Sequence, residues 1–129
     1  MNKLIALLLL STTVLLSGCA TPPSEQQLSN IDYGASPINY ESAIKKYFED
    51  SLFDPYSAHY DFELPEQMWV KDSPLRGGRL SAGYMVRVGI NAKNRLGGYT
   101  GKKMYGFIIK DERIIKVMDE FELQNLKAK

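Results

Sequence analysis

The sequence has one cysteine, Cys19, and one histidine, His59, among its 129 residues. A single cysteine cannot form a disulfide within the chain, and a single histidine leaves few ligands for a transition-metal site. The chain also lacks the G-x-S-x-G pattern of a nucleophile elbow. We therefore predict no metal, no cofactor and no enzymatic activity, and a minor hydrolase is the least favoured function.

Neither sign of charge is in excess, since 16 Lys and Arg face 15 Asp and Glu. Lys3 is the only charge in residues 1–18, so residues 19–129 carry 15 charges of each sign. Binding to nucleic acid needs a basic excess that neutralises phosphates. This balance excludes nucleic acid as the expected partner, and a chain of this size has room for one small domain.

No apolar run is long enough to cross a membrane as a helix. The longest runs from Leu4 to Leu16, directly after Lys3. As a helix it would measure roughly 20 Å, whereas the hydrocarbon core of a bilayer is about 30 Å thick. A positive residue followed by a short apolar run is typical of a secretory signal peptide. We predict that residues 1–18 are a cleaved signal peptide.

The apolar run ends in Leu16, Ser17, Gly18 and Cys19, a segment that resembles the lipobox of bacterial lipoproteins. In that family a diacylglyceryl group is attached to the cysteine thiol, and a signal peptidase cuts just before it. The resemblance implies that Cys19 carries the lipid and that acyl chains such as palmitate hold the protein to a membrane. Ala20 follows instead of aspartate, which in Gram-negative lipoproteins implies the outer membrane, here facing the periplasm.

The rest of the chain divides into three parts. Residues 19–38 hold the lipidated cysteine and a polar stretch with three prolines, which predicts a flexible tether. The alternative is that residues 31–33 dock on the domain. Residues 39–118 are predicted to be a small α+β domain, and residues 119–129 a C-terminal tail or short helix.

Hydrophobic periodicity indicates the elements of the domain. Apolar residues at three- and four-residue steps predict a helix from Asn39 to about Phe53. Two-residue alternation then predicts strands at 60–64, 84–93, 102–110 and 113–118, with 68–70 continuing the first after a bend. The fold class is therefore α+β, with one N-terminal helix packed on a three- to four-stranded antiparallel sheet. This order resembles cystatin-like and other small α+β folds, a likeness that carries no function.

The turn at residues 94–101 contains Gly97, Gly98 and Gly101. It is not a phosphate-binding P-loop, because position 96 is leucine and a strand follows instead of a helix. In one interpretation the glycines supply positive φ angles to a hairpin turn. In the other, basic and amide donors around an aromatic form a recognition loop for a glycan, a phosphate or an acidic protein surface. The candidate residues are Asn91, Lys93, Asn94, Arg95, Tyr99, Lys102 and Lys103.

Three ionisable residues, His59, Asp61 and Glu63, alternate along the first strand. A metal site can be imagined there, but three ligands on one flat strand rarely converge, and charged residues on the solvent side of a half-buried strand are the simpler explanation.

Two segments, at residues 54–58 and 91–101, resemble those of small bacterial envelope lipoproteins to which no activity is attached. The predicted function is a lipoprotein anchored in the outer membrane, with a non-enzymatic binding or assembly module that contacts an envelope protein or glycan. The alternative is an envelope-binding protein for a small ligand such as a glycan or a lipid phosphate.

Overall fold

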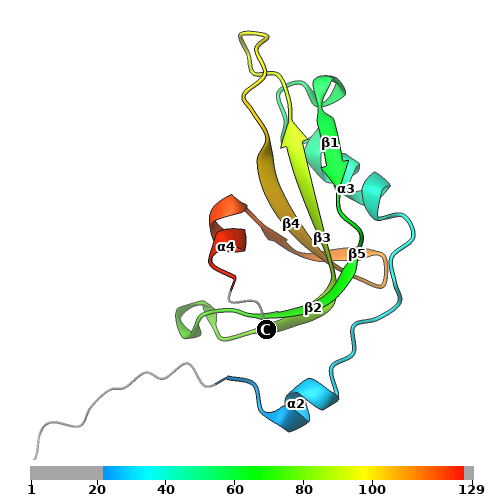
Figure 1. Cartoon of the computed structure of the whole chain (residues 1–129), viewed down its shortest axis with the longest axis vertical. Helices are drawn as coiled ribbons and strands as arrows, with labels where there is room; N and C mark the ends of the chain where they lie inside the picture. Colours follow the sequence, from blue (N-terminus) through cyan, green and yellow to red (C-terminus); the bar gives the residue numbers. More distant parts are fainter. Residues whose placement is uncertain (1–21, 127–129) are drawn as a thin grey trace, which may run out of the picture.

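The computed structural model describes residues 22–126, so the predicted signal peptide and Cys19 lie outside the described residues. The described part is an α+β domain (Figure 1). Its elements in chain order are α2 (Glu25–Ser29), α3 (Tyr40–Glu49), the 3-10 turn η1 (Pro55–Ser57), β1 (His59–Phe62), β2 (Glu66–Lys71), the 3-10 turn η2 (Pro74–Arg76), β3 (Leu80–Asn91), β4 (Lys103–Lys110), β5 (Arg113–Met118) and α4 (Glu120–Gln124).

The sheet has five antiparallel strands, with β3 at its centre. The path runs β1-β3-β4-β5, and β2 pairs with the same strand, β3. β1 lies along the end of β3, where Phe62 is opposite Val88, and β2 lies along its beginning, where Glu66 is opposite Met85. Between them Pro65 has no N–H to donate, and the predicted continuation of the first strand becomes a separate strand. The expectation of three or four strands is therefore corrected to five.

One face of the sheet is covered by α3. Ile44 and Phe48 of this helix are buried against side chains of β3 and β4: Val86, Val88, Ile90, Phe107 and Ile109. The Phe48 ring lies 5.7 Å from the ring of Phe107, edge to face. Burying a large apolar side chain contributes about 1.5–3 kcal/mol, so this cluster supplies much of the stability of the domain.

The opposite face has a smaller second core. Met85, Ile108 and Met118 are almost fully buried there, and α4 covers them with Leu123. Gly106 allows this close approach, because a Cβ at that position would stand 2.6 Å from Leu123 Cδ2. Only the N-terminal helix was expected to pack on the sheet, so this second layer was not predicted. α4 lies within the stretch predicted as a tail or short helix.

The described part of the predicted tether contacts the domain. The Asp32 carboxylate lies 2.9 Å from Lys110 Nζ, at the end of β4. Glu112, in the β4–β5 turn, accepts backbone N–H bonds from residues 38 and 39 at 2.7 and 3.2 Å. These contacts correspond to the docking alternative at Asp32, and a tether function for residues 19–38 stays a prediction.

Candidate functional site

The predicted recognition loop connects β3 to β4 and projects at the end of the molecule opposite α2 (Figure 1). The segment around η1 lies against its base. Lys93 N–H donates to Ser57 Oγ at 3.0 Å, and the Tyr99 hydroxyl donates to Ser57 O at 3.3 Å. We call residues 53–57 and 92–102 together the hairpin end.

Asparagine side chains shape the turn. Asn94 Oδ1 accepts the backbone N–H groups of Leu96 and Gly98, at 2.9 and 3.1 Å. Asn91 Oδ1 accepts the N–H of Gly101 at 3.1 Å. The side chains of Asn91 and Asn94, whose amide groups were predicted as donors for recognition, therefore have their oxygens bonded within the hairpin itself.

Two of the three glycines have the left-handed backbone that the turn interpretation expects. The φ angles of Gly97 and Gly101 are +79° and +94°. No neighbouring heavy atom lies within 4 Å of the position of a Cβ at either residue, so the dihedral angle and not the space requires glycine. Gly98 has no positive φ, and the expectation of one at that position is wrong.

Tyr99 connects the hairpin to β1. Its hydroxyl lies 2.9 Å from His59 Nε2, and the two rings are 5.3 Å apart. The side chain is nevertheless 47% exposed. Tyr99 therefore has a structural role and also contributes to the surface.

The four predicted cations have different surroundings. Lys102 crosses over Gly89, where a Cβ would collide with it, and forms an ion pair with Asp61. Lys103 begins β4 and is exposed. Lys93 Nζ lies 5.6 Å from the centre of the Tyr99 ring.

Arg95 has an aromatic neighbour as well, because its guanidinium lies 5.7 Å from the centre of the Phe53 ring. Lys93 and Arg95 thus sit at the hairpin end beside aromatic rings, an arrangement in which the charge remains available to an anion.

Three large apolar side chains complete the hairpin end, and sequence reasoning missed all of them. Phe53 is 64%, Tyr56 is 99% and Leu96 is 94% exposed. The helix was predicted to reach about Phe53, but α3 ends at Glu49. The Asp54-Pro55 pair could have indicated that an irregular surface segment begins here, because the residue before a proline disfavours the helical conformation.

The uneven distribution of charge along the chain is a second sequence feature that could have indicated this surface. No Asp or Glu occurs between Asp72 and Asp111, a segment with eight cations. Away from the hairpin, several of these cations are paired with carboxylates from other parts of the chain; Arg87, for example, lies 3.6 Å from Glu63. The balanced charge of the whole chain concealed this local excess.

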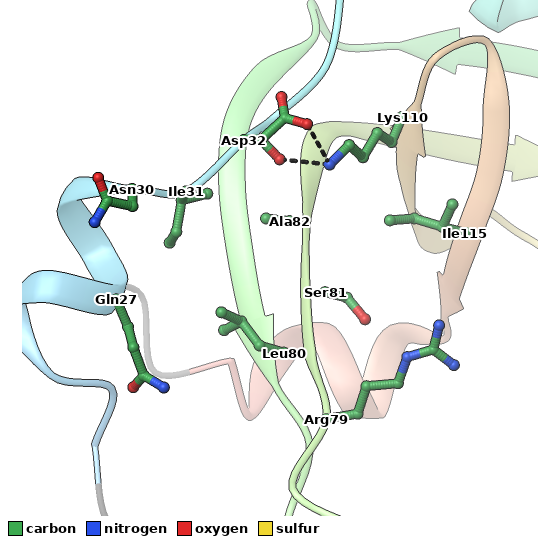
Figure 2. A pocket seen from close by; sticks show the side chains of 10 residues that line it. All are labelled: Gln27, Asn30, Ile31, Asp32, Arg79, Leu80, Ser81, Ala82, Lys110 and Ile115. Atoms are coloured by element: carbon green, nitrogen blue, oxygen red, sulfur yellow. Dashed lines mark hydrogen bonds and ion pairs between the residues drawn. The ribbon is translucent and has the colours of Figure 1, made fainter.

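A second candidate is a hollow of about 470 Å³ between α2 and the beginning of β3 (Figure 2). Its polar lining is largely engaged in other bonds. Gln27 Oε1 accepts the N–H of Ser24, Asn30 Nδ2 donates to a backbone carbonyl of α2, and Asp32 is paired with Lys110. The hydrogen bond from Lys110, assisted by the Gly34 N–H, lowers the pKa of Asp32. These bonds engage the side chains of Gln27, Asn30, Asp32 and Lys110 with other groups of the protein, while Arg79 and Ser81 also line the hollow.

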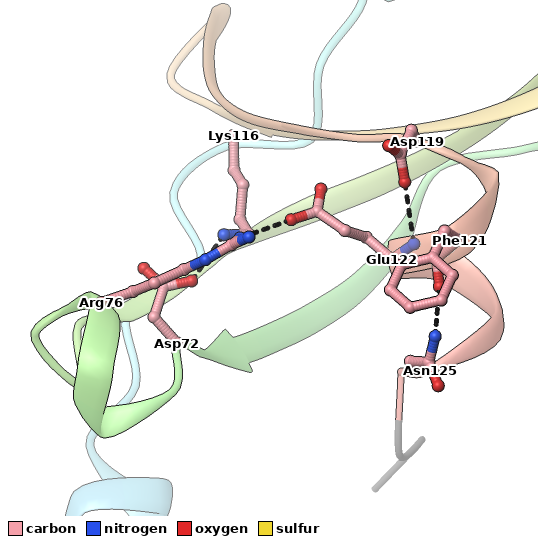
Figure 3. Close-up of polar contacts among 7 residues, drawn as sticks. All are labelled: Asp72, Arg76, Lys116, Asp119, Phe121, Glu122 and Asn125. Carbon is pink, nitrogen blue, oxygen red and sulfur yellow. Dashed lines mark hydrogen bonds and ion pairs between the residues drawn. The ribbon is translucent and has the colours of Figure 1, made fainter.

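A third cluster fastens η2 to α4 and β5 (Figure 3). Arg76 lies 2.7 Å from Glu122, which raises the pKa of the Arg76 guanidinium. Lys116 lies 2.6 Å from Asp72, and both of these side chains are less than one-fifth exposed. Each of these two cations is paired with a carboxylate, so we assign the cluster a structural role in connecting η2 to α4 and β5.

The three side chains considered as metal ligands on the first strand have other partners. His59 bonds to Tyr99, Asp61 pairs with Lys102, and Glu63 pairs with Arg87. Within residues 22–126, no group of three or more His, Cys, Asp or Glu is placed to hold a metal ion.

None of the helices in the described part of the chain has the length and apolar composition needed to span a bilayer. Comparison of the chain with protein-family models, with curated proteins and with solved structures finds no match in any of the three.

Proposed function

We propose that the chain is a lipoprotein, anchored through Cys19 in the outer membrane, with a non-enzymatic binding module that faces the periplasm. The short apolar leader and the resemblance of residues 16–19 to a lipobox support the anchor. The hairpin end lies far from α2, the first helix after Cys19 in the described part of the chain (Figure 1). This separation supports the module, because the hairpin end can contact a partner while the other end of the chain is anchored.

The observation that carries the binding function is the exposed surface of the hairpin end. Phe53, Tyr56 and Leu96 are each more than 60% exposed, and Lys93 and Arg95 lie among the aromatic residues there. Aromatic and arginine side chains are enriched at interaction surfaces, and clustered exposed apolar residues commonly mark them. An enzyme would instead need a catalytic constellation in a cleft.

The hollow beside α2 supports the second candidate, binding of a small ligand such as a glycan or a lipid phosphate. Its volume of about 470 Å³ is in the range of ligand sites. Because Asp32 and Lys110 neutralise each other at its rim, we rank this function below the binding module.

Fatty-acid labelling tests the anchor. Cys19→Ser removes the thiol that would carry the diacylglyceryl group, so the variant should accumulate as an unlabelled precursor. Ser24→Ala, outside the lipobox, serves as the control and should be labelled like the wild type. Equal labelling of the Cys19→Ser variant would contradict the anchor.

A further inference from the structure

We propose that the hairpin end docks on an anionic lipid bilayer. In this arrangement Leu96, Phe53 and Tyr56 enter the membrane interface, and Lys93 and Arg95 contact the phosphates of the headgroups. The contact rests on the proposed function, because it names the partner of the same surface, the hairpin end, and it does not involve the lipid predicted on Cys19.

The apolar side chains are suited to an interface. Leu96 lies in the turn of the hairpin and is 94% exposed, while Phe53 and Tyr56 stand on the adjoining segment. Leucine and aromatic side chains favour the boundary between headgroups and acyl chains. The hairpin projects from the domain (Figure 1), so these side chains can reach a surface without a rearrangement of the sheet.

Three successive backbone N–H groups of the turn are hydrogen-bonded within the hairpin. The N–H groups of Leu96 and Gly98 donate to Asn94 Oδ1, and that of Gly97 donates to Asn94 O at 3.0 Å. An unpaired N–H group that enters hydrocarbon costs several kcal/mol, whereas one that faces water does not. Internal bonding of these three donors lowers the cost of placing the turn in a lipid interface.

The charges of the hairpin end match an anionic membrane. Lys93 and Arg95 lie over aromatic rings, and no carboxylate occurs in residues 92–102. The hairpin end contains one carboxylate, Asp54, which accepts the N–H of Ser57 at 3.2 Å, and the neighbouring Asp61 pairs with Lys102. Lys93 and Arg95 therefore leave an excess of positive charge. Each free cation near an anionic bilayer contributes favourably to binding.

Vesicle clustering tests this contact. The full chain is reconstituted in neutral phosphatidylcholine vesicles, and labelled phosphatidylglycerol vesicles are added. We expect clustering with the phosphatidylglycerol vesicles and none with added phosphatidylcholine vesicles. Retention of the chain in the host vesicles reports on its anchor separately, so failure of the anchor and failure of the docking are distinguishable.

Matched variants locate the contact. Lys93→Gln with Arg95→Gln should weaken clustering about 10- to 30-fold, at roughly 1 kcal/mol per cation, whereas Arg79→Gln with Arg113→Gln removes the same charge elsewhere and should leave it unchanged. Leu96→Ser should also weaken clustering.

Leu75→Ser is the control for Leu96→Ser, because Leu75 is 99% exposed in η2. All four variants should melt like the wild type, since none of the altered side chains is buried. Clustering that is independent of phosphatidylglycerol, or that is equal in hairpin and control variants, would overturn the proposal. Loss of a protein crosslink in the hairpin variants, without any clustering by the wild type, would assign the surface to a protein partner instead.

Discussion

The two turns at the ends of β3 share several features. The β2–β3 turn, which contains η2, exposes 99% of Leu75, and the β3–β4 hairpin exposes 94% of Leu96. Each turn has a glycine with positive φ, Gly77 in the first and Gly97 in the second. An exposed leucine on a glycine turn therefore does not by itself distinguish a binding surface.

The surroundings of the cation next to each exposed leucine in sequence distinguish the two turns, although the β2–β3 turn also contains a second, exposed cation, Arg79. In the β2–β3 turn, Arg76 is held 2.7 Å from Glu122 of α4 (Figure 3). In the hairpin, Lys93 and Arg95 have aromatic rings beside them. A cation that is already paired gains little from a new anion, whereas one on an aromatic ring can still bind one. We infer a binding surface at the hairpin.

The largest expected loss of stability comes from a substitution in the core between α3 and the sheet, and both turns extend from β3 of that sheet. Phe48 is 3% exposed between α3 and the sheet, so Phe48→Ala should cost about 3–5 kcal/mol of unfolding free energy, measured by denaturant titration. Phe53→Ala makes the same chemical change on a side chain that is 64% exposed, and should change stability little. Equal effects of the two substitutions would contradict the packing described here.

A smaller loss is expected from the backbone of the hairpin. Gly97→Val places a branched side chain at a φ angle of +79°, which should cost about 1–2 kcal/mol. Gly98→Val is the control, because Gly98 has no positive φ and the nearest atom to its Cβ position is 3.9 Å away. Thermal unfolding compares them, and a control variant as unstable as Gly97→Val would refute the assignment.

The attachment of the hairpin to β1 depends on one hydroxyl. Tyr99→Phe removes the bonds to Ser57 O and His59 Nε2, so thermal unfolding should show a loss of about 0.5–1.5 kcal/mol. Tyr56→Phe removes a hydroxyl from a side chain that is 99% exposed and should unfold like the wild type. An unchanged Tyr99→Phe variant would mean that the hairpin is held by other contacts.

The smallest expected effect is on vesicle binding by the β2–β3 turn, and it tests whether pairing of the cation distinguishes the two turns. Glu122→Gln removes the carboxylate that pairs with Arg76, so the β2–β3 turn should gain a weak attraction to phosphatidylglycerol vesicles with little change in melting temperature. Glu120→Gln changes the net charge equally but leaves the Arg76–Glu122 pair intact. A gain shared by both variants would show that net charge, and not pairing, is the cause.

Much of the fold could be predicted from local patterns. The two-residue alternation of residues 84–93 identified most of β3, and the helical spacing that begins at Asn39 identified α3. The five-strand count and the second core could not be predicted in this way. The strand count depends on the pairing of β2 with the beginning of β3, and the second core depends on the packing of α4 against Met85, a residue far from α4 in the sequence.

The candidate site was predicted in part. Lys93, Arg95 and Tyr99 do gather at the hairpin end, because a tight turn keeps sequence neighbours together. Lys102 is diverted to Asp61, on a strand that precedes it by about 40 residues. Tyr56 was missed, since only the folded chain places η1 against the hairpin.

Tryptophan fluorescence at the hairpin tests the membrane contact most directly. In the full chain carrying Trp69→Phe and reconstituted in phosphatidylcholine vesicles, Leu96→Trp provides the only indole at the hairpin and Leu75→Trp the only one at the β2–β3 turn. On addition of phosphatidylglycerol vesicles with brominated acyl chains, emission from position 96 should shift to shorter wavelength and be quenched, while emission from position 75 stays unchanged. Unchanged emission from position 96, or equal quenching at both positions, would contradict docking by the hairpin end.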